Sequence, residues 1–210
     1  MSDDDRPIAI LRGLPHGYRD QAALLFDEAF GSKMGLALPD REKRLPLLAR
    51  AIRADHAVVA ERDGRLLGMV GLTAREGRYE RGLIDVPWDP RRNSDLLGLG
   101  GAVRAVLGLR LAEHKPRPGE LYIDGIAVTP DARGEGVGTG LLDEAHAIAR
   151  EGGFRWVRLD VVDTNARAQA LYERLGYRVT RVQSFRHMER VVGFGGMVSM
   201  ERLVERPGPA

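Results

Sequence analysis

A glycine-rich turn near the middle of the chain constrains the fold more than any other feature. It reads Arg133-Gly134-Glu135-Gly136-Val137-Gly138, and it joins an apolar run at 121–128 to an amphipathic segment at 138–150. The run predicts a buried strand, and the segment predicts a helix packed on a sheet. The first amides of a helix lack intrahelical partners and lie at the positive end of its dipole, so such a junction suits a phosphate group. The sequence therefore predicts an anion site made of main-chain N–H groups from Gly134 to Thr139.

Two common phosphate-binding loops do not match this turn. The P-loop ends in Gly-Lys-Ser or Gly-Lys-Thr, and no lysine follows these glycines. The dinucleotide pattern G-x-G-x-x-G places its third glycine at Thr139 when counted from Gly134, and at Leu141 when counted from Gly136. A domain for another dinucleotide is therefore a weak alternative, and a purely structural loop is the other alternative.

Periodicity along the rest of the chain predicts strands and helices in alternation. Apolar runs predict strands at 7–14, 56–61, 65–73, 121–128, 155–162, 177–182 and 195–203. Helical spacing of apolar residues predicts helices at 18–30, 41–54, 96–114, 138–150 and 166–175. Asp63-Gly64 predicts a tight hairpin, Gly68 and Gly71 predict bulges or close backbone approaches, and Gly176 predicts a helix stop. The helix at 96–114 could line a substrate cleft, form a dimer interface or simply pack, and the sequence leaves these readings open.

The composition is typical of one soluble globular domain. The 210 residues are 43% hydrophobic and 30% charged, which favours a single core over a disordered chain. We expect a disordered acidic tail at 1–6, one domain at 7–204 with a variable helical segment at 75–119, and a frayed tail at 205–210. The 32 basic and 30 acidic residues are interleaved, so no nucleic-acid partner is expected. The basic stretch 41–53 is expected to be the solvated face of a helix rather than a phosphate-binding patch.

Several classes of site are excluded or not expected. The absence of cysteine excludes disulfides, thiolate metal sites and a cysteine nucleophile. The five histidines show no metal-ligand spacing, so we expect no metal site. The first residues are acidic where a signal peptide is basic, and no apolar run is long enough to cross a bilayer. We therefore expect a cytoplasmic protein without a membrane partner.

Around the glycine-rich turn the chain resembles the GCN5-related N-acetyltransferase (GNAT) family. The family's cofactor loop reads Gln/Arg-x-x-Gly-x-Gly/Ala, and Arg133, Gly136 and Gly138 match it. The resemblance extends from the strand at 121–128 through Leu159-Asp160-Val161 and then through the segment 165–177, NARAQALYERLGY. It covers 121–179 closely, as an acetyl-CoA-binding core, whereas the N-terminal helices and the hairpin match only in the order of elements.

The resemblance implies an α/β fold of the α+β kind, with a central, mostly antiparallel, splayed mixed sheet flanked by helices. Acetyl-CoA would be the cosubstrate, and its pantetheine arm would lie as a pseudo-strand between the strands at 121–128 and 155–162. Gly125 would bulge and point an N–H at the thioester carbonyl, and Asn165 would either contact the arm or cap the next helix. The cofactor-binding residues would be Ile126, Ala127 and Val128 along the arm, and Arg133, Gly134, Glu135, Gly136, Val137, Gly138 and Thr139 at the pyrophosphate.

Acetyl transfer to an amine uses a base for the amine and an acid for the departing thiolate. Tyr172 is the expected acid, because family members that use an acid place a tyrosine at this position. Its phenol could protonate the sulfur or only hydrogen-bond to it. The alternative is a tyrosine that packs between helix and sheet, with the neighbouring Leu171 as a further apolar anchor.

Asp124 is the leading candidate for the base. Strand alternation would place it with Tyr122 and Ile126 on one face, next to the thioester. A carboxylate there could instead pair with the ammonium group of the substrate. Glu120 and Asp85 are weaker choices.

The resemblance thus implies an N-acetyltransferase that moves the acetyl group of acetyl-CoA to a primary amine of a small molecule or a protein. The alternative is a non-catalytic module that binds acyl-CoA as a sensor. A homodimer is possible, since family members often dimerise.

Overall fold

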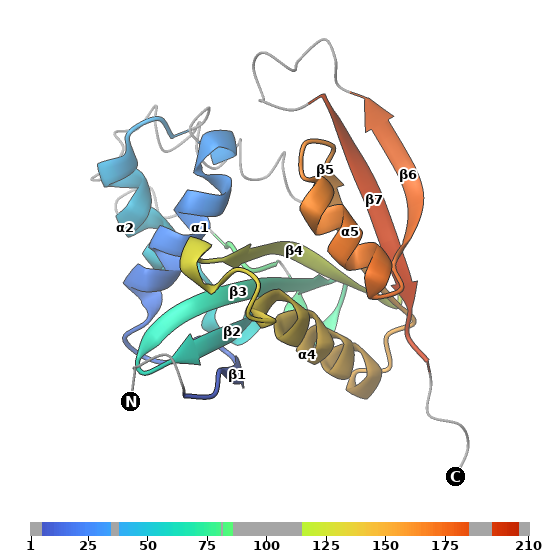
Figure 1. Ribbon diagram of the computed structural model, residues 1–210, viewed down its shortest axis with the longest axis horizontal. Coiled ribbons are helices and arrows are strands. Elements are labelled where there is room, and N and C mark those ends of the chain that lie inside the picture. The colour runs from blue at the N-terminus through green and yellow to red at the C-terminus, as the bar shows by residue number, and fades with distance from the viewer. Residues whose placement is uncertain (1–5, 35–37, 81, 86–114, 185–194, 206–210) are drawn as a thin grey trace.

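A seven-stranded sheet runs through the molecule in the order β1-β2-β3-β4-β5-β7-β6 (Figure 1). The computed structural model describes residues 6–34, 38–80, 82–85, 115–184 and 195–205. The strands are β1 (Ala9–Arg12), β2 (Ala57–Arg62), β3 (Arg65–Ala74), β4 (Glu120–Val128), β5 (Trp156–Val162), β6 (Arg178–Ser184) and β7 (Gly196–Leu203). All neighbouring strands are antiparallel except β4 and β5, which are parallel. The sheet is therefore mixed and mostly antiparallel, as expected.

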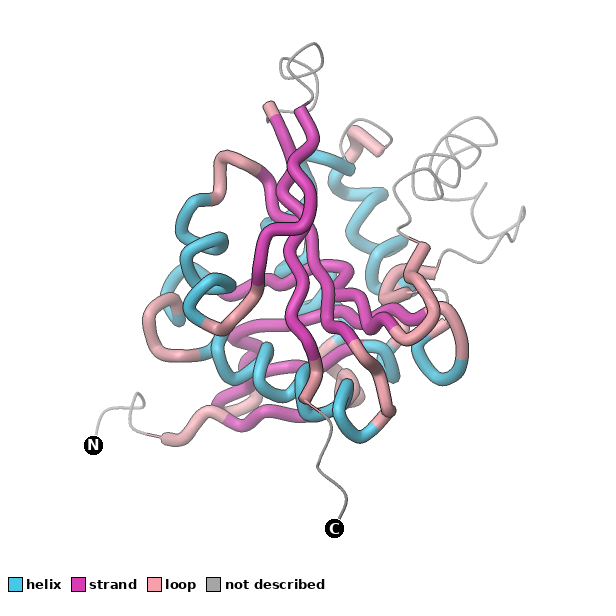
Figure 2. Tube along the Cα trace, turned by 90° about the vertical axis from the view of Figure 1, so that its right-hand side faces the viewer, coloured by secondary structure: helices cyan, strands magenta, loops and turns pink. Residues whose placement is uncertain are grey.

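Helices cover both faces of the sheet (Figures 1 and 2). The α-helices are α1 (Arg19–Met34), α2 (Arg41–Ala51), α4 (Val137–Glu151) and α5 (Ala166–Arg174), and the short 3-10 helices are η2 (Ala54–His56), η3 (Gly77–Tyr79) and η4 (Pro130–Ala132). One core joins α1 and α2 to the sheet through residues such as Ala22, Leu48 and Met69. The other joins α4 and α5 to the opposite face through residues such as Leu141 and Tyr172. Two separate apolar layers therefore hold the sheet between helices.

The strands β4 and β5 pair over only part of their length. Their parallel register begins at Glu120 opposite Trp156 and ends at Ile123 opposite Leu159. Beyond this point β4 stays paired to β3 as far as Val128, while β5 stays paired to β7. We call the place where the two strands part the fork. It confirms the expected splay, and within the described ranges it leaves the edge of β4 that faces β5 without a strand partner from residue 124 onward.

A β-bulge lies at the fork. On β3 and β4, Gly71 faces Gly125 and Leu72 faces Ile123, so Asp124 has no residue opposite it. The bulge was expected at Gly125 and is centred one residue earlier. Because a bulge inserts one residue into one strand, it shifts the phase of side-chain alternation beyond it.

The expected grouping of Tyr122, Asp124 and Ile126 on one face of β4 is therefore right for Tyr122 and Asp124 and wrong for Ile126. Asp124 contacts Leu83, which belongs to the core beneath α1 and α2. Ile126 instead packs against the core beneath α4. The backbone of Gly125 faces α1, where an added Cβ would lie 2.7 Å from Cζ of Phe30. A single extra residue thus separates side chains that strict alternation would have grouped.

Close backbone approaches at Gly68 and Gly71 agree with the sequence. A Cβ on Gly68 would lie 2.8 Å from Cγ1 of Val137 and 3.0 Å from Cδ1 of Leu141. One on Gly71 would lie 2.5 Å from Cδ2 of Leu83. The missing side chain on Gly68 lets the first turn of α4 pack directly on β3, which fixes the position of the loop that precedes it.

Most element boundaries agree with the predictions to within a few residues. The hairpin between β2 and β3 has Asp63 at φ 52° and Gly64 at φ 76°, as a tight turn requires, and Gly176 ends α5 at φ 84°. The first helix is one turn longer than predicted, because Gly31 continues it to Met34. The predicted helix at 96–114 lies outside the described residues, as do residues 1–5 and 206–210 of the tails predicted at 1–6 and 205–210. No helix in the described ranges has the length and apolar character needed to cross a membrane.

A buried carboxylate fastens α1 to α2. Asp27 accepts hydrogen bonds from Arg44 Nε at 2.6 Å and from Arg41 Nε at 2.7 Å, and the side chains of Asp27 and Arg44 are 4% and 8% exposed. Burial alone would raise the pKa of Asp27, but the two arginine bonds outweigh it and hold that pKa below its ordinary value. The ionised carboxylate therefore stabilises the pairing of the two helices.

We predict that Asp27→Asn lowers the free energy of unfolding by about 3 kcal/mol at pH 7, because Arg44 is left buried without its counter-charge. The depressed pKa makes this contribution fully present above the unfolded-state value, and it disappears as pH falls through the folded-state pKa. Urea unfolding of wild type and variant should therefore differ at pH 7 and converge in strong acid. Asp20→Asn, at an exposed position of the same helix, is the control. Equal losses in the two variants would contradict the prediction.

Candidate functional site

The loop between η4 and α4 presents unused main-chain donors. Among the described residues, no hydrogen-bond partner exists for the amides of Gly134, Gly136, Val137, Gly138 and Thr139. Gly134 and Gly136 have φ of 99° and 85°, and Gly136 is the helix N-cap without any side-chain cap bond. Successive free amides at the start of a helix attract an anion through hydrogen bonds and through the dipole. Two further amides, those of Arg133 and Glu135, make only long 3.4 Å bonds within the turn.

The hairpin between β2 and β3 braces this loop from the side. Arg62 Nη2 lies 2.5 Å from the Glu135 carboxylate, and Arg65 Nη2 lies 2.6 Å from that of Asp131. The amide of Thr129 donates to the carbonyl of Leu67 at 2.8 Å. Both ends of the loop are therefore held, so that presenting its amides to a ligand costs little ordering entropy.

The loop lies at the open end of the fork. A Cβ on Gly138 would be 3.5 Å from Cδ2 of Leu171 in α5 and 4.0 Å from Cγ2 of Val128 at the end of β4. The start of α4, the end of β4 and the middle of α5 are thus brought together. The residues expected along a pantetheine arm, Ile126, Ala127 and Val128, form the edge of β4 that leads from this point to the fork.

Tyr172 lies in the core between α5 and the sheet and is 4% exposed. Tyr172 therefore packs between helix and sheet, which was the alternative expected for this residue. Among the described residues, its hydroxyl makes no hydrogen bond. Burial raises the pKa of Tyr172 to about 12, so the phenol keeps its proton at neutral pH and can donate it.

Tyr177 packs next to Tyr172, and its hydroxyl is hydrogen-bonded. The ring of Tyr177 lies 5.8 Å from that of Tyr172, and its Oη lies 2.9 Å from Nε2 of His146. Nδ1 of His146 accepts from Arg202 Nη1 at 3.1 Å, so the neutral imidazole carries its proton on Nε2 and donates to Tyr177. Burial, helped by Arg202 and Arg150, lowers the pKa of His146 to about 4, which keeps the ring neutral.

Asn165 caps α5. Its side-chain oxygen accepts from the amide of Ala168 at 3.1 Å, so the capping reading of this residue is confirmed. The side-chain amide nitrogen is not needed for the cap and can serve as a donor.

The three candidate bases lie in different parts of the sheet and its surroundings. Asp124 lies at the fork, but its Oδ2 accepts from the Thr73 hydroxyl and, at 2.7 Å, from the amide of Leu83. Glu120 is buried at the closed end of the β4–β5 pairing, 3.9 Å from Nη1 of Arg158. Asp85 follows the bridge between Ile52 and Ile84, beside the end of α2. Asp124 alone of the three adjoins the fork.

Sequence reasoning gave no role to a second acidic residue at the fork. Asp160 is the first residue of β5 beyond its last pair with β4, and its Oδ2 accepts a 3.1 Å hydrogen bond from the hydroxyl of Tyr122. Its Oδ1 is buried without a hydrogen-bond partner among the described residues. The segment Leu159-Asp160-Val161 drew attention only as part of a family pattern. Asp160 could have been recognised only from its position across the fork from Asp124, and that position depends on how the strands pair.

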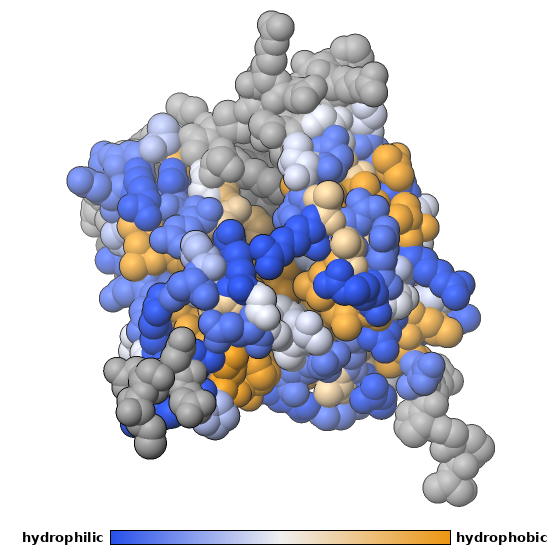
Figure 3. Space-filling view, in the orientation of Figure 1, coloured by the Kyte–Doolittle hydropathy of each residue, from blue (hydrophilic) through white to orange (hydrophobic). Residues whose placement is uncertain are grey.

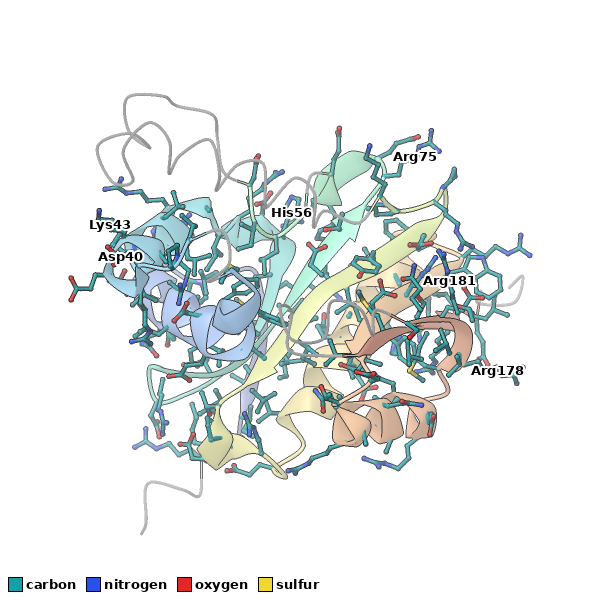
Figure 4. All side chains as sticks on the ribbon, turned by 90° about the horizontal axis from the view of Figure 1, so that it is seen from above. Asp40, Lys43, His56, Arg75, Arg178 and Arg181 are labelled. Carbon is teal, nitrogen blue, oxygen red and sulfur yellow. The ribbon has the colours of Figure 1, made fainter. Side chains whose placement is uncertain are left out.

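Among the described residues, no group of histidine, aspartate and glutamate has the arrangement of a metal site. His16 is exposed, His56 is fully buried beside Tyr79, and His146 is buried beneath Tyr177. Figure 4 shows His56 well separated from the arginines that project from β6. His114 and His187 lie outside the described residues.

Comparisons with known proteins agree with this geometry. Over 84 residues the chain is 38% identical to a mycothiol acetyltransferase of Beutenbergia cavernae, covering 40% of this chain and 27% of that protein. Over 56 residues it is 38% identical to a thialysine N-epsilon-acetyltransferase of Bos taurus, covering 27% of this chain and 33% of that protein. The matched segments thus span only about a quarter to a third of these curated relatives.

Solved structures share the fold. A crystal structure described only as an acetyltransferase superposes with a TM-score of 0.62 at 20% identity and covers 94% of this chain and all of that one. A GCN5-related N-acetyltransferase from Kribbella flavida gives a TM-score of 0.60 at 19% identity, covering 93% and 97% of the two chains. The model of the acetyltransferase (GNAT) family matches residues 24–177, which is most of the chain. With the fork, the open loop amides and this match together, the chain belongs to the GNAT acetyltransferase family.

Proposed function

We propose that this protein transfers the acetyl group of acetyl-CoA to a primary amine of a small molecule or a protein. The observation that carries the proposal is the row of open amides from Gly134 to Thr139 at the mouth of the fork. A diphosphate can accept several of these N–H groups at once, while an extended arm can pair with the free edge of β4. Family membership and the names of the two relatives support acetyl transfer.

Acetyl-CoA supplies an activated acetyl thioester, and the residues at the fork supply what its transfer needs. The amine attacks the carbonyl carbon with its lone pair, so its ammonium form must first lose a proton, and a nearby carboxylate can take that proton. Asp124 is the proposed group for this role. Its bonds to Thr73 and Leu83 fix the carboxylate at the bulge, which keeps it beside the place where the carbonyl would lie.

Negative charge develops on the carbonyl oxygen as the new C–N bond forms. The bulge leaves Asp124 without a residue opposite it on β3, and a main-chain N–H at this point is proposed to receive that charge. As the C–S bond breaks, Tyr172 is proposed to hydrogen-bond to the leaving sulfur or to protonate it. Asn165 is proposed to donate its side-chain amide to the arm.

The direct test is turnover. Purified protein is mixed with acetyl-CoA and a panel of amines, thiol release is followed, and binding of coenzyme A is measured by calorimetry. Binding with turnover supports the proposal. Binding without turnover of any amine favours an acyl-CoA sensor, and failure to bind coenzyme A excludes both.

We predict that Gly136→Ala weakens coenzyme A binding at least about tenfold, because an alanine resists the left-handed backbone that aims the loop amides and adds a methyl group where the phosphate would approach. The control is Gly153→Ala at the other end of α4, where φ is 69° and the surrounding space is equally open. Both variants should lose about 1 kcal/mol of stability, since each forces an alanine into a left-handed conformation. Equal affinities of the two variants for coenzyme A would remove the loop from the cofactor site.

We predict that Tyr172→Phe lowers kcat about 10- to 100-fold with little change in KM for acetyl-CoA, because the proton donor acts only in the transition state. The stability of the variant should stay close to that of wild type, since the lost hydroxyl has no partner among the described residues. Since the pKa of Tyr172 is about 12, its titration should not lower the wild-type rate below pH 10.

The control for this prediction is Tyr177→Phe, which removes a neighbouring hydroxyl that is bonded to His146. It should lose about 1 kcal/mol of stability and keep its rate. Comparable rate losses in the two variants would show that the core, rather than the Tyr172 phenol, controls the reaction.

A further inference from the structure

We propose that Asp160 and Tyr122 form an acceptor subsite that binds a second positive charge, so that the preferred acceptor is a diamine or another amine carrying a separate cationic group. The inference rests on the proposed function, since it assumes that the acceptor reaches the fork. It assigns a specificity role to Asp160, distinct from the handling of the reacting nitrogen by Asp124.

The fork places two carboxylates at matching positions. The last residues paired between β4 and β5 are Ile123 and Leu159, and the next residue on each strand is an aspartate, Asp124 and Asp160. Paired strands lie about 4.8 Å apart, so the two backbones begin to part with an acidic residue on either side. A molecule entering the fork between them meets both.

Both carboxylates belong to the face of the sheet that carries α1 and α2. Asp124 contacts Leu83 in the core of that face. On β5, Val157, Leu159 and Val161 pack into the opposite core, so alternation directs Asp160 toward the α1 side. Tyr122 lies with them, because its hydroxyl donates to Oδ2 of Asp160 at 3.1 Å. Burial first, and then the charges of Asp160 and Asp124, raise the pKa of Tyr122. The phenol therefore remains a neutral donor between two acids.

The two aspartates differ in the hydrogen bonds that their carboxylate oxygens already accept. Asp124 uses Oδ2 for two donors from this chain. Asp160 receives a single hydrogen bond, at Oδ2, and its buried Oδ1 has no partner in the described ranges. An unsatisfied buried carboxylate oxygen is costly, and a hydrogen bond from a cation to it is worth more than one between neutral groups. Asp160 is thus the fork residue with capacity for an ammonium group.

Among the described residues, no arginine or lysine forms an ion pair with Asp160. Arg158 precedes it on the same strand by two residues and is buried, and its Nη1 lies 3.9 Å from Glu120. Arg181 lies in register with Ser199 of β7, which is itself opposite Asp160, but it is exposed and forms no ion pair within the described part of the chain. Figure 4 shows Arg178 and Arg181 at the β6 side of the molecule, far from Asp40 and Lys43 of the α2 region.

The experiment uses the coenzyme A complex, so that binding is read without turnover. Calorimetry compares 1,4-diaminobutane with 1-aminobutane on wild type, Asp160→Asn and Asp143→Asn, the last at an exposed position of α4. We expect wild type to bind the diamine at least about tenfold more tightly than the monoamine, as expected for a charge-assisted bond. Asp160→Asn should lose that preference and Asp143→Asn should keep it. Equal binding of the two amines by wild type, including no measurable binding of either, overturns the proposal.

Turnover separates this role from general-base catalysis. With acetyl-CoA, Asp160→Asn should raise KM for the diamine and leave kcat within about threefold, while the kinetics with 1-aminobutane change little. A fall in kcat for both amines at unchanged KM would make Asp160 a base and overturn the proposal. Failure of the proposed function is distinguishable, because it would appear as no acetyl transfer to any amine, whatever the calorimetric preference.

Discussion

The early end of the pairing between β4 and β5 is the constraint on which the rest of the structure depends. Four register pairs join the strands, from Glu120 with Trp156 to Ile123 with Leu159, and each strand then follows its other neighbour. Sheets are stable when their main-chain groups are bonded, so an interruption inside a sheet persists only where the flanking layers hold both sides. Here β4 is held by β3 and the two helix layers, and β5 is held by β7 and α5.

Several features of the site follow from that interruption. The bulge shifts side-chain alternation beyond Asp124, and the absence of a side chain at Gly125 lets the Phe30 ring pack on the backbone at the fork. Gly68 lets α4 approach β3, which brings the open loop amides to the end of β4. The proposed site is thus formed mainly by backbone geometry, and a small number of side chains complete it. On the face shown in Figure 3, hydrophilic and hydrophobic residues are interspersed.

Local patterns in the sequence predicted most of the elements and the glycine-rich loop before α4, because these depend on neighbours in the chain. Glycine spacing marked the loop, Asp63-Gly64 marked the hairpin and Gly176 marked the end of α5. The bulge could not be placed from the sequence, since it depends on Thr73 and Leu83, which lie some forty to fifty residues before Asp124. For the same reason Asp160 went unnoticed. The order that puts β7 between β5 and β6 likewise depends on long-range pairing.

The fork also means that the sheet of the free protein is incomplete. In the described chain, the part that carries β1 to β4 and the part that carries β5 to β7 share main-chain bonds at the closed end of the fork, over residues 119–123 and 155–159. An arm bound along β4 would pair with the open edge of this strand and link the two parts across the gap. Ligand binding is therefore expected to strengthen the link between the two parts of the sheet. Slow amide hydrogen exchange on both sides of the fork would indicate a bound ligand, and faster exchange would indicate that the ligand has left.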